Sequence, residues 1–334
     1  MNETMYGMFQ GIGKVNIDQT MRTIKRMTDR SSRVCAVLAM LLLLSCGCNT
    51  GKGPAADTAG DAGITDAGVS AADSTDMFRA ASLFWEGFDY SNPALSADST
   101  GLERAFAAWV SLLALLPQEQ AAPLAGELIA RGKDAPAMQL RLGELAELYL
   151  DDPNSPYRSE ELYIPVLEAL ITAPKIDEAY KIRPRAQLLS AMKNRPGART
   201  TDIAYTTDDG GQGTLYGLRS EYTLLLFYNP DCHDCGRVET HIVRSDVFGP
   251  LIASGRLRVL AIYPDEDLAA WKEHLPQMPA EWIVGHVFVG RTADSPYDLP
   301  AIPCLYLLDC NKTVILKDAP VERIEEWLSD KVDQ

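Results

Sequence analysis

The stretch that most constrains the fold is 222–235 (YTLLLFYNPDCHDC), where an apolar run ends in two cysteines three residues apart. Residues 224–228 carry no polar interruption, which predicts a strand buried on both faces. An Asn-Pro-Asp sequence then ends that strand. From 235 to 243 the apolar residues have helical spacing, so the predicted order is strand, tight turn and helix.

This order gives the cysteine spacing a chemical meaning. Residues i and i+3 on a first helical turn face the same way, so the sulfurs of Cys232 and Cys235 can come within bonding reach. Cys232 falls at the helix N-terminus, where free N–H groups and the helix dipole favour a thiolate. We therefore predict a redox dithiol in which Cys232 attacks and the more covered Cys235 resolves the mixed disulfide.

Two other interpretations of the cysteine pair are a structural disulfide and half of a zinc site. Zinc would need two further Cys or His ligands at tight spacing, whereas His241, His274 and His286 are scattered singly. We expect no metal and no organic cofactor.

Length and charge limit the function classes. The 334 residues allow about two domains once a leader is removed, and 46% hydrophobic content is ordinary for a globular protein. The net charge is −15; residues 1–45 hold six Lys/Arg against three acids, a net of +3, so the rest carries −15 − 3 = −18. This excess of acid argues against nucleic acid as a partner.

The N-terminal 45 residues are interpreted as a secretory signal peptide, with translation starting at Met21 or Met27. The apolar run 34–44 follows two arginines and is too short to span a bilayer as a helix. Residues 43–46 (LLSC) resemble a bacterial lipobox, so Cys46 is predicted to become the lipid-modified N-terminus, an ordinary cleaved signal without lipid being the alternative. We expect a protein of the cell envelope, anchored to a bacterial membrane and facing the periplasm or the exterior.

The remaining chain divides into a tether and two domains. Residues 46–76 are rich in Gly, Ala, Asp, Ser and Thr and predict a flexible tether. Residues 77–197 carry apolar residues at helical intervals, as in 78–88, 102–116, 138–150 and 160–171, and predict an all-α domain of unknown role.

Residues 198–334 predict an α/β domain. After the Asn-Arg-Pro-Gly boundary at 194–197 we expect strands at 203–205, 214–218 and 256–263, a helix at 268–275 capped by Asp265, a hairpin at 305–317 and a closing helix at 321–327. Together with the central strand and the dithiol helix, this is the element order of a thioredoxin-like fold.

At LLLFYNPDCHDC and at 301–309 (AIPCLYLLD), residues 200–332 resemble the cell-envelope thioredoxin-like lipoproteins of the TlpA/ResA type. The helical half resembles an uncharacterised domain found fused to such thioredoxins, and it carries no activity over. The resemblance implies that Pro303 is a cis-proline facing the dithiol, and that Ile302 offers its backbone to an extended substrate peptide. An edge-strand trans-proline is the alternative.

The chain departs from this family in its charges near the dithiol. Thioredoxins carry a buried acid six residues before the nucleophile, where this chain has Leu226, so their proton-transfer route cannot be assumed. His233 and Asp234 stand between the cysteines and are predicted to tune the dithiol, a purely solvated role being the alternative. Because Asp231 adds a second acid, we expect a weakly stabilised thiolate and therefore a reducing centre.

Cys304, beside Pro303, is interpreted as a small apolar strand residue, with a third working thiol as the alternative. Taken together, we expect a membrane-anchored thiol–disulfide oxidoreductase that acts on protein disulfides and is recharged by an electron donor of the envelope. The rival hypotheses are a copper(I) metallochaperone using the dithiol with Cys304 or a histidine, and a non-enzymatic binding module.

Overall fold

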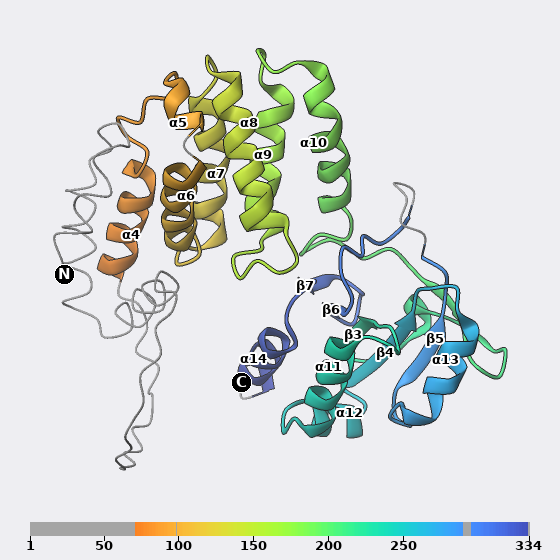
Figure 1. Cartoon of the computed structure of the whole chain (residues 1–334). Coiled ribbons are helices and arrows are strands. Elements are labelled where there is room, and N and C mark those ends of the chain that lie inside the picture. The colour runs from red at the N-terminus through yellow and green to blue at the C-terminus, as the bar shows by residue number, and fades with distance from the viewer. Residues whose placement is uncertain (1–70, 98, 290–294, 333–334) are drawn as a thin grey trace, which may run out of the picture. The chain divides into compact units, whose positions relative to one another are not determined.

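The computed structural model describes residues 71–97, 99–289 and 295–332 (Figure 1). The chain divides into two compact units, Met1–Pro184 and Arg185–Gln334. The predicted signal peptide, the lipidation residue Cys46 and tether residues 46–70 lie outside the described residues.

The first unit is helical, as predicted. Its helices are α4 (Ala71–Leu83), α5 (Pro93–Ala97), α6 (Ser99–Leu113), α7 (Gln118–Arg131), α8 (Pro136–Ala146), the π-helical turn η1 (Glu147–Asp151), α9 (Glu160–Thr172) and α10 (Glu178–Ala191), whose last turns belong to the second unit. Figure 1 shows α6 to α9 lying side by side. In the described ranges, no helix has the length and apolar character needed to cross a bilayer.

The core of this unit explains its aromatic residues. Trp85 and Trp109 are buried and stack edge to face, and the indole N–H of Trp109 donates to the Ala81 carbonyl at 3.0 Å. Helices α7 and α9 pack closely, since a Cβ on Gly126 would lie 3.0 Å from Pro165. These two indoles therefore serve packing in the core of the helical unit.

The second unit is built on a seven-stranded sheet in the order β2-β1-β5-β4-β3-β6-β7. The strands are β1 (Ala204–Thr206), β2 (Gln212–Thr214), β3 (Tyr222–Phe227), β4 (Leu257–Tyr263), β5 (Ile283–His286), β6 (Cys304–Leu308) and β7 (Val314–Lys317). Strand β3 lies parallel to β4 and antiparallel to β6. The helices are α11 (His233–Arg244), α12 (Phe248–Ala253), α13 (Leu268–His274) and α14 (Val321–Val332), with short 3₁₀ turns η2 (Leu215–Gly217) and η3 (Leu275–Gln277).

The central strand is buried on both faces, as the apolar run predicted. Leu224 and Leu226 pack with side chains of α11 to α14, on what we call the helix-covered face. Leu225 and Phe227 point the other way, into a cluster that contains Cys304, on what we call the Cys304 face. Each face of the sheet thus has its own core.

Three expectations of local structure were wrong, and one strand was not predicted. Residues 214–218 are not a strand, because Thr214 Oγ1 accepts the Gly217 N–H at 3.0 Å and winds the chain into η2. Asp267, not Asp265, caps α13, accepting the N–H groups of two following residues. Strand β5 was not foreseen, and α4 ends at Leu83 rather than at residue 88 because a turn follows it.

The unit boundaries also differ from the predicted ones. Helix α4 begins at Ala71, inside the segment predicted as tether. The second unit begins at Arg185 rather than at residue 198. The end of α10 belongs to the second unit because it is tied to β7. The ammonium of Lys317 donates to the carbonyls of Ala191 and Lys193, at 3.2 and 2.7 Å.

Candidate active site

Cys232 lies where the sequence predicted, at the start of α11. It is the N-cap residue, with φ −91° and ψ 112°, and its Sγ accepts the backbone N–H of Cys235 at 3.3 Å. The side chain is half-buried, so a substrate can reach the sulfur. A half-buried sulfur that caps a helix is the arrangement that the sequence predicted for Cys232.

Cys235 lies one turn further along α11 and is 1% exposed. Burial, and secondly a hydrogen bond with Cys232, raise the pKa of the Cys235 thiol far above its ordinary value. Cys235 is therefore held as a neutral thiol, directly behind the more accessible sulfur. This is the asymmetry that an attacking and a resolving cysteine require.

The loop before β6 faces the dithiol. The Ile302–Pro303 peptide bond is cis, as the family resemblance implied. The thiol of Cys232 donates to the Ile302 carbonyl at 3.4 Å. The strand register explains why this loop lies beside the dithiol. Phe227 at the end of β3 lies opposite Cys304 at the start of β6, so the segment after β3 and the segment before β6 share one edge of the sheet.

His233 and Asp234 are exposed between the two cysteines. Their side chains are 97% and 69% exposed, and His233 Nδ1 lies 3.8 Å from Asp234 Oδ1. Arg237 Nε approaches the same carboxylate at 3.9 Å. Since water and salt screen exposed charges, this geometry favours the solvated role over strong tuning of the dithiol.

The turn between β3 and α11 is fixed by polar contacts of its own. Asn229 Oδ1 accepts the N–H of Asp231 at 3.0 Å, and Asn229 Nδ2 donates to Asp265 at 2.8 Å. Asp265, which the sequence suggested as a helix cap, instead ties the dithiol turn to the end of β4. Asn229 thus fixes the turn that leads into Cys232.

Sequence reasoning missed a half-buried acidic residue on α11. Leu226, where the resembled family has its buried acid, is fully buried in the apolar core. Glu239 instead lies behind the dithiol, four residues after Cys235, with its carboxylate 3.8 Å from Nε2 of His274. The two side chains are only 15% and 16% exposed. The one signal in the sequence was the i, i+4 spacing from Cys235, which places both on one helix face.

The other cysteines lie away from the dithiol. Cys304 is buried on the Cys304 face, on the opposite side of the sheet from Cys235, and Cys310 is exposed in the turn between β6 and β7. This placement favours the packing interpretation of Cys304 over a third thiol beside the dithiol. Within the described ranges, no group of three or more His, Cys, Asp or Glu side chains is arranged to hold a metal ion.

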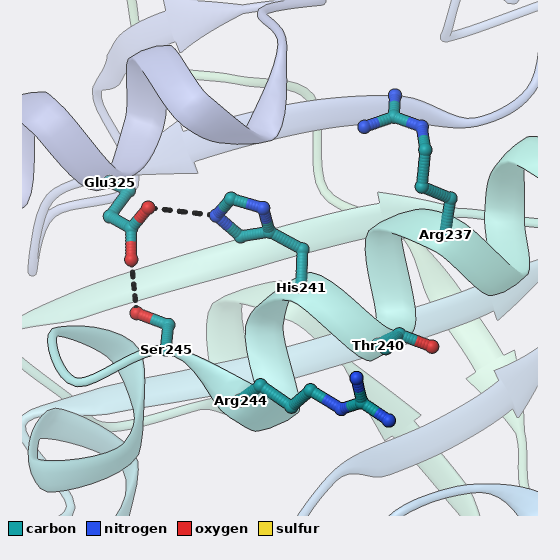
Figure 2. Close-up of a pocket in the computed structure, with 6 residues that line it drawn as sticks. All are labelled: Arg237, Thr240, His241, Arg244, Ser245 and Glu325. Carbon is teal, nitrogen blue, oxygen red and sulfur yellow. Dashed lines mark hydrogen bonds and ion pairs between the residues drawn. The ribbon is translucent and has the colours of Figure 1, made fainter. Parts of the chain in front are cut away.

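An open hollow of about 390 Å³ lies over α11 and α14, lined by Arg237, Thr240, His241, Arg244, Ser245 and Glu325 (Figure 2). Glu325 accepts the Ser245 hydroxyl with one carboxylate oxygen and contacts His241 Nε2 at 2.8 Å with the other. These contacts fasten α11 to α14. Neither cysteine lines this hollow, so it is separate from the dithiol.

Comparison with known proteins extends these observations. Residues 79–194 match the family model described as "Domain of unknown function (DUF5106)", and no curated protein matches the chain. A thioredoxin-like protein from Bacteroides caccae is 36% identical, with 83% of this chain and 99% of that one covered and a TM-score of 0.74. The C-terminal domain of an uncharacterised protein from Bacteroides fragilis is 44% identical, covering 41% of this chain and 98% of that one, with a TM-score of 0.39.

Proposed function

Because the chain belongs to the thioredoxin-like proteins, we propose that it is a membrane-tethered thiol–disulfide oxidoreductase that reduces protein disulfides in the cell envelope. One observation carries the proposal. A half-exposed Cys232 caps α11 and accepts the Cys235 N–H, while the Cys235 thiol is buried directly behind it.

The geometry supports a two-step exchange. The thiolate of Cys232 attacks a substrate disulfide, forming a mixed disulfide and releasing one substrate sulfur as a thiolate. Cys235 then loses its proton and attacks Cys232 Sγ, so a Cys232–Cys235 disulfide forms and the second substrate sulfur leaves. Two electrons pass to the substrate, and an electron donor of the envelope must reduce the dithiol again.

The carbonyl of Ile302 orients the incoming chain in this proposal. It accepts from Cys232 at 3.4 Å, so a main-chain N–H of an extended peptide can replace that contact beside the sulfur. Such backbone recognition is independent of side chains, which suits an enzyme with several protein substrates.

The test is a trap. A Cys235→Ser variant should accumulate covalent complexes with its client proteins, because the mixed disulfide forms but is not resolved. Complexes are detected on non-reducing gels and must disappear on reduction. The matched control is the Cys232→Ser, Cys235→Ser double variant, which should trap nothing; equal trapping by both variants would refute the proposed attack by Cys232.

We further propose that the dithiol works as a reductant. Glu239 is acidic and lies behind Cys235, and Asp231 and Asp234 flank the dithiol, so the surroundings do not favour thiolates strongly. We expect a potential nearer the thioredoxin value of about −270 mV than the DsbA value of about −120 mV. Titration against glutathione buffers measures it, and a value above about −180 mV would exclude this direction.

Anchoring through Cys46 is a separate part of the proposal, supported by the lipobox-like sequence 43–46. Cells expressing the full chain should incorporate a radiolabelled fatty acid into it. A Cys46→Ala variant should lose the label, whereas Cys48→Ala, two residues on, should keep it. Label retained by the Cys46→Ala variant would remove the lipid anchor from the proposal.

A further inference from the structure

The resolving step leaves one proton unaccounted for. Cys235 is a buried neutral thiol, and it must lose its proton before its sulfur can attack Cys232. Position 226, on the central strand, is a buried leucine and can accept no proton. A proton acceptor on the helix-covered face would serve this step better than solvent, because the Cys235 thiol is buried there.

Glu239 is placed to be that group. It is four residues after Cys235 on α11, so the two Cβ atoms are about 5–6 Å apart on the same helix face. Its carboxylate is 15% exposed, and its charge acts on the Cys235 thiol. Burial raises the pKa of Glu239, while the nearby His274 opposes that rise. A carboxyl with a raised pKa is a better proton acceptor than an ordinary surface glutamate.

The surroundings of Glu239 contain polar groups that packing alone does not require. In the part of the chain that the structure describes, the hydroxyl of Tyr228, the indole N–H of Trp271 and Nε2 of His274 are buried without a hydrogen-bond partner. The His274 ring lies 6.0 Å from the Tyr228 ring, and Tyr228 follows the last residue of β3. The charge of Glu239 acts on the Tyr228 hydroxyl, so this carboxyl lies among polar groups that respond to a change in its charge.

We propose that Glu239 accepts the proton of the Cys235 thiol during resolution, and that His274 is a positioning residue that holds this carboxylate in its ionised form. The inference rests on the proposed oxidoreductase function and deepens it. The titratable groups that face Glu239 are Cys235 on its own helix, His274 on α13 and Tyr228 after β3.

The step balances as follows. The S–H bond of Cys235 breaks and its proton goes to a carboxylate oxygen of Glu239. The electron pair left on sulfur forms the new S–S bond to Cys232, and the bond between Cys232 and the substrate sulfur breaks, with its pair leaving on the substrate. When the dithiol is later reduced, the proton returns from Glu239 to Cys235. His274 Nε2 lies 3.8 Å from the carboxylate, longer than a hydrogen bond, so its effect on Glu239 is mainly electrostatic.

The two chemical steps can be followed separately with Ellman's reagent, an aromatic disulfide that releases a coloured thiol. Attack by Cys232 releases the first coloured thiol, and attack by Cys235 on the mixed disulfide releases the second. The full chain is used, with serine in place of Cys35, Cys46, Cys48 and Cys310. Cys304 is kept because it is buried in the sheet.

In Glu239→Gln the second phase should slow by at least about tenfold at neutral pH, because the amide cannot accept a proton. Its rate should then rise steadily with pH as solvent takes over, while the first phase stays within about twofold of the parent. The matched control is Glu273→Gln, which removes the same charge from an exposed position next to His274 and should change neither phase. A second phase in Glu239→Gln with the parent's rate and pH profile would overturn the inference.

The His274→Gln variant gives an independent readout. Since His274 lowers the pKa of Glu239, its removal should shift the acidic limb of the second-phase rate to higher pH. An unshifted limb contradicts the positioning role, and this variant decides the question if Glu239→Gln also loses the first phase through misfolding. A parent protein that shows no fast first phase would instead contradict the proposed function itself.

Discussion

Each face of the central sheet buries a cysteine, but the two cysteines have opposite surroundings. Cys235, on the helix-covered face, is buried behind the half-exposed Cys232 and near the ionisable Glu239. Cys304, on the other face, is packed among aromatic side chains that include Phe227 and Tyr297. Both thiols are therefore buried. Only Cys235 has a second cysteine and an ionisable side chain beside it, which thiol–disulfide exchange requires.

The polar groups of the two faces differ in the same way. On the Cys304 face, the Tyr297 hydroxyl donates to the Thr201 carbonyl at 2.6 Å and contacts Thr200 Oγ1 at 3.1 Å. On the helix-covered face, the Tyr228 hydroxyl is near Trp271 but meets no partner with hydrogen-bond geometry among the described residues. The two tyrosines therefore differ: the Tyr297 hydroxyl contributes hydrogen bonds to the fold, whereas the Tyr228 hydroxyl is buried without that gain.

The largest expected effect concerns the cysteines themselves. Cys232→Ser should reduce the rate of insulin disulfide reduction by at least about a thousandfold, because serine is no nucleophile toward disulfides. Cys304→Ala should leave that rate within about twofold, since the thiol lies across the sheet from the dithiol. Both are measured with the full chain and a chemical reductant as electron source.

The control for this comparison is the fold of each variant, followed by circular dichroism. A folded Cys304→Ala variant that lost activity to the same degree as Cys232→Ser would break the contrast between the faces. It would make Cys304 a working thiol despite its place in the apolar core.

A pair of tyrosine substitutions tests the contrast in stability. Tyr297→Phe removes a hydroxyl that makes two hydrogen bonds, so the free energy of unfolding should fall by about 1–2 kcal/mol. Tyr228→Phe removes a buried hydroxyl that lacks such bonds, so the change should stay within about 0.5 kcal/mol or be stabilising. Urea unfolding of the full chain, followed by tryptophan fluorescence, measures both.

The reverse order of the two tyrosine effects would mean that the Tyr228 hydroxyl is satisfied in solution. That result would remove one of the observations behind the proton-transfer proposal, without touching the dithiol.

Local patterns predicted the part of the site that neighbouring residues build. The apolar run before Cys232 and its spacing to Cys235 contain the strand, the turn and the helix start, so the placement of both cysteines was confirmed. The cis bond before Pro303 was predicted only through the family resemblance, since the great majority of such bonds are trans.

The half-buried pair of Glu239 and His274 could not be predicted in the same way. The two residues come from different helices, and their meeting depends on how α13 packs beside the sheet. Strand β5 was not predicted for a related reason. Its four residues have no clear hydrophobic periodicity and form a strand only by pairing with β4. Long-range pairing decides both features, and a single sequence carries little signal of it.

The smallest expected effect is on stability and comes from the helix-covered face. Burial raises the pKa of Glu239 in the folded chain, so the folded state binds its proton more tightly than the unfolded state does. The carboxyl therefore contributes stability that is present below its unfolded pKa and is lost as the pH rises through the folded value. Glu239→Gln cannot ionise, so it should be more stable than the parent at neutral pH, and the difference should shrink as the pH is lowered.

Urea midpoints across a pH series measure this difference in stability, with Glu273→Gln as the exposed control that should show no such trend. The opposite result is a Glu239→Gln variant that is both less stable at neutral pH and slower in resolution. It would mean that the carboxylate and His274 stabilise the helix-covered face. The contrast between the helix-covered face and the Cys304 face would then be weaker.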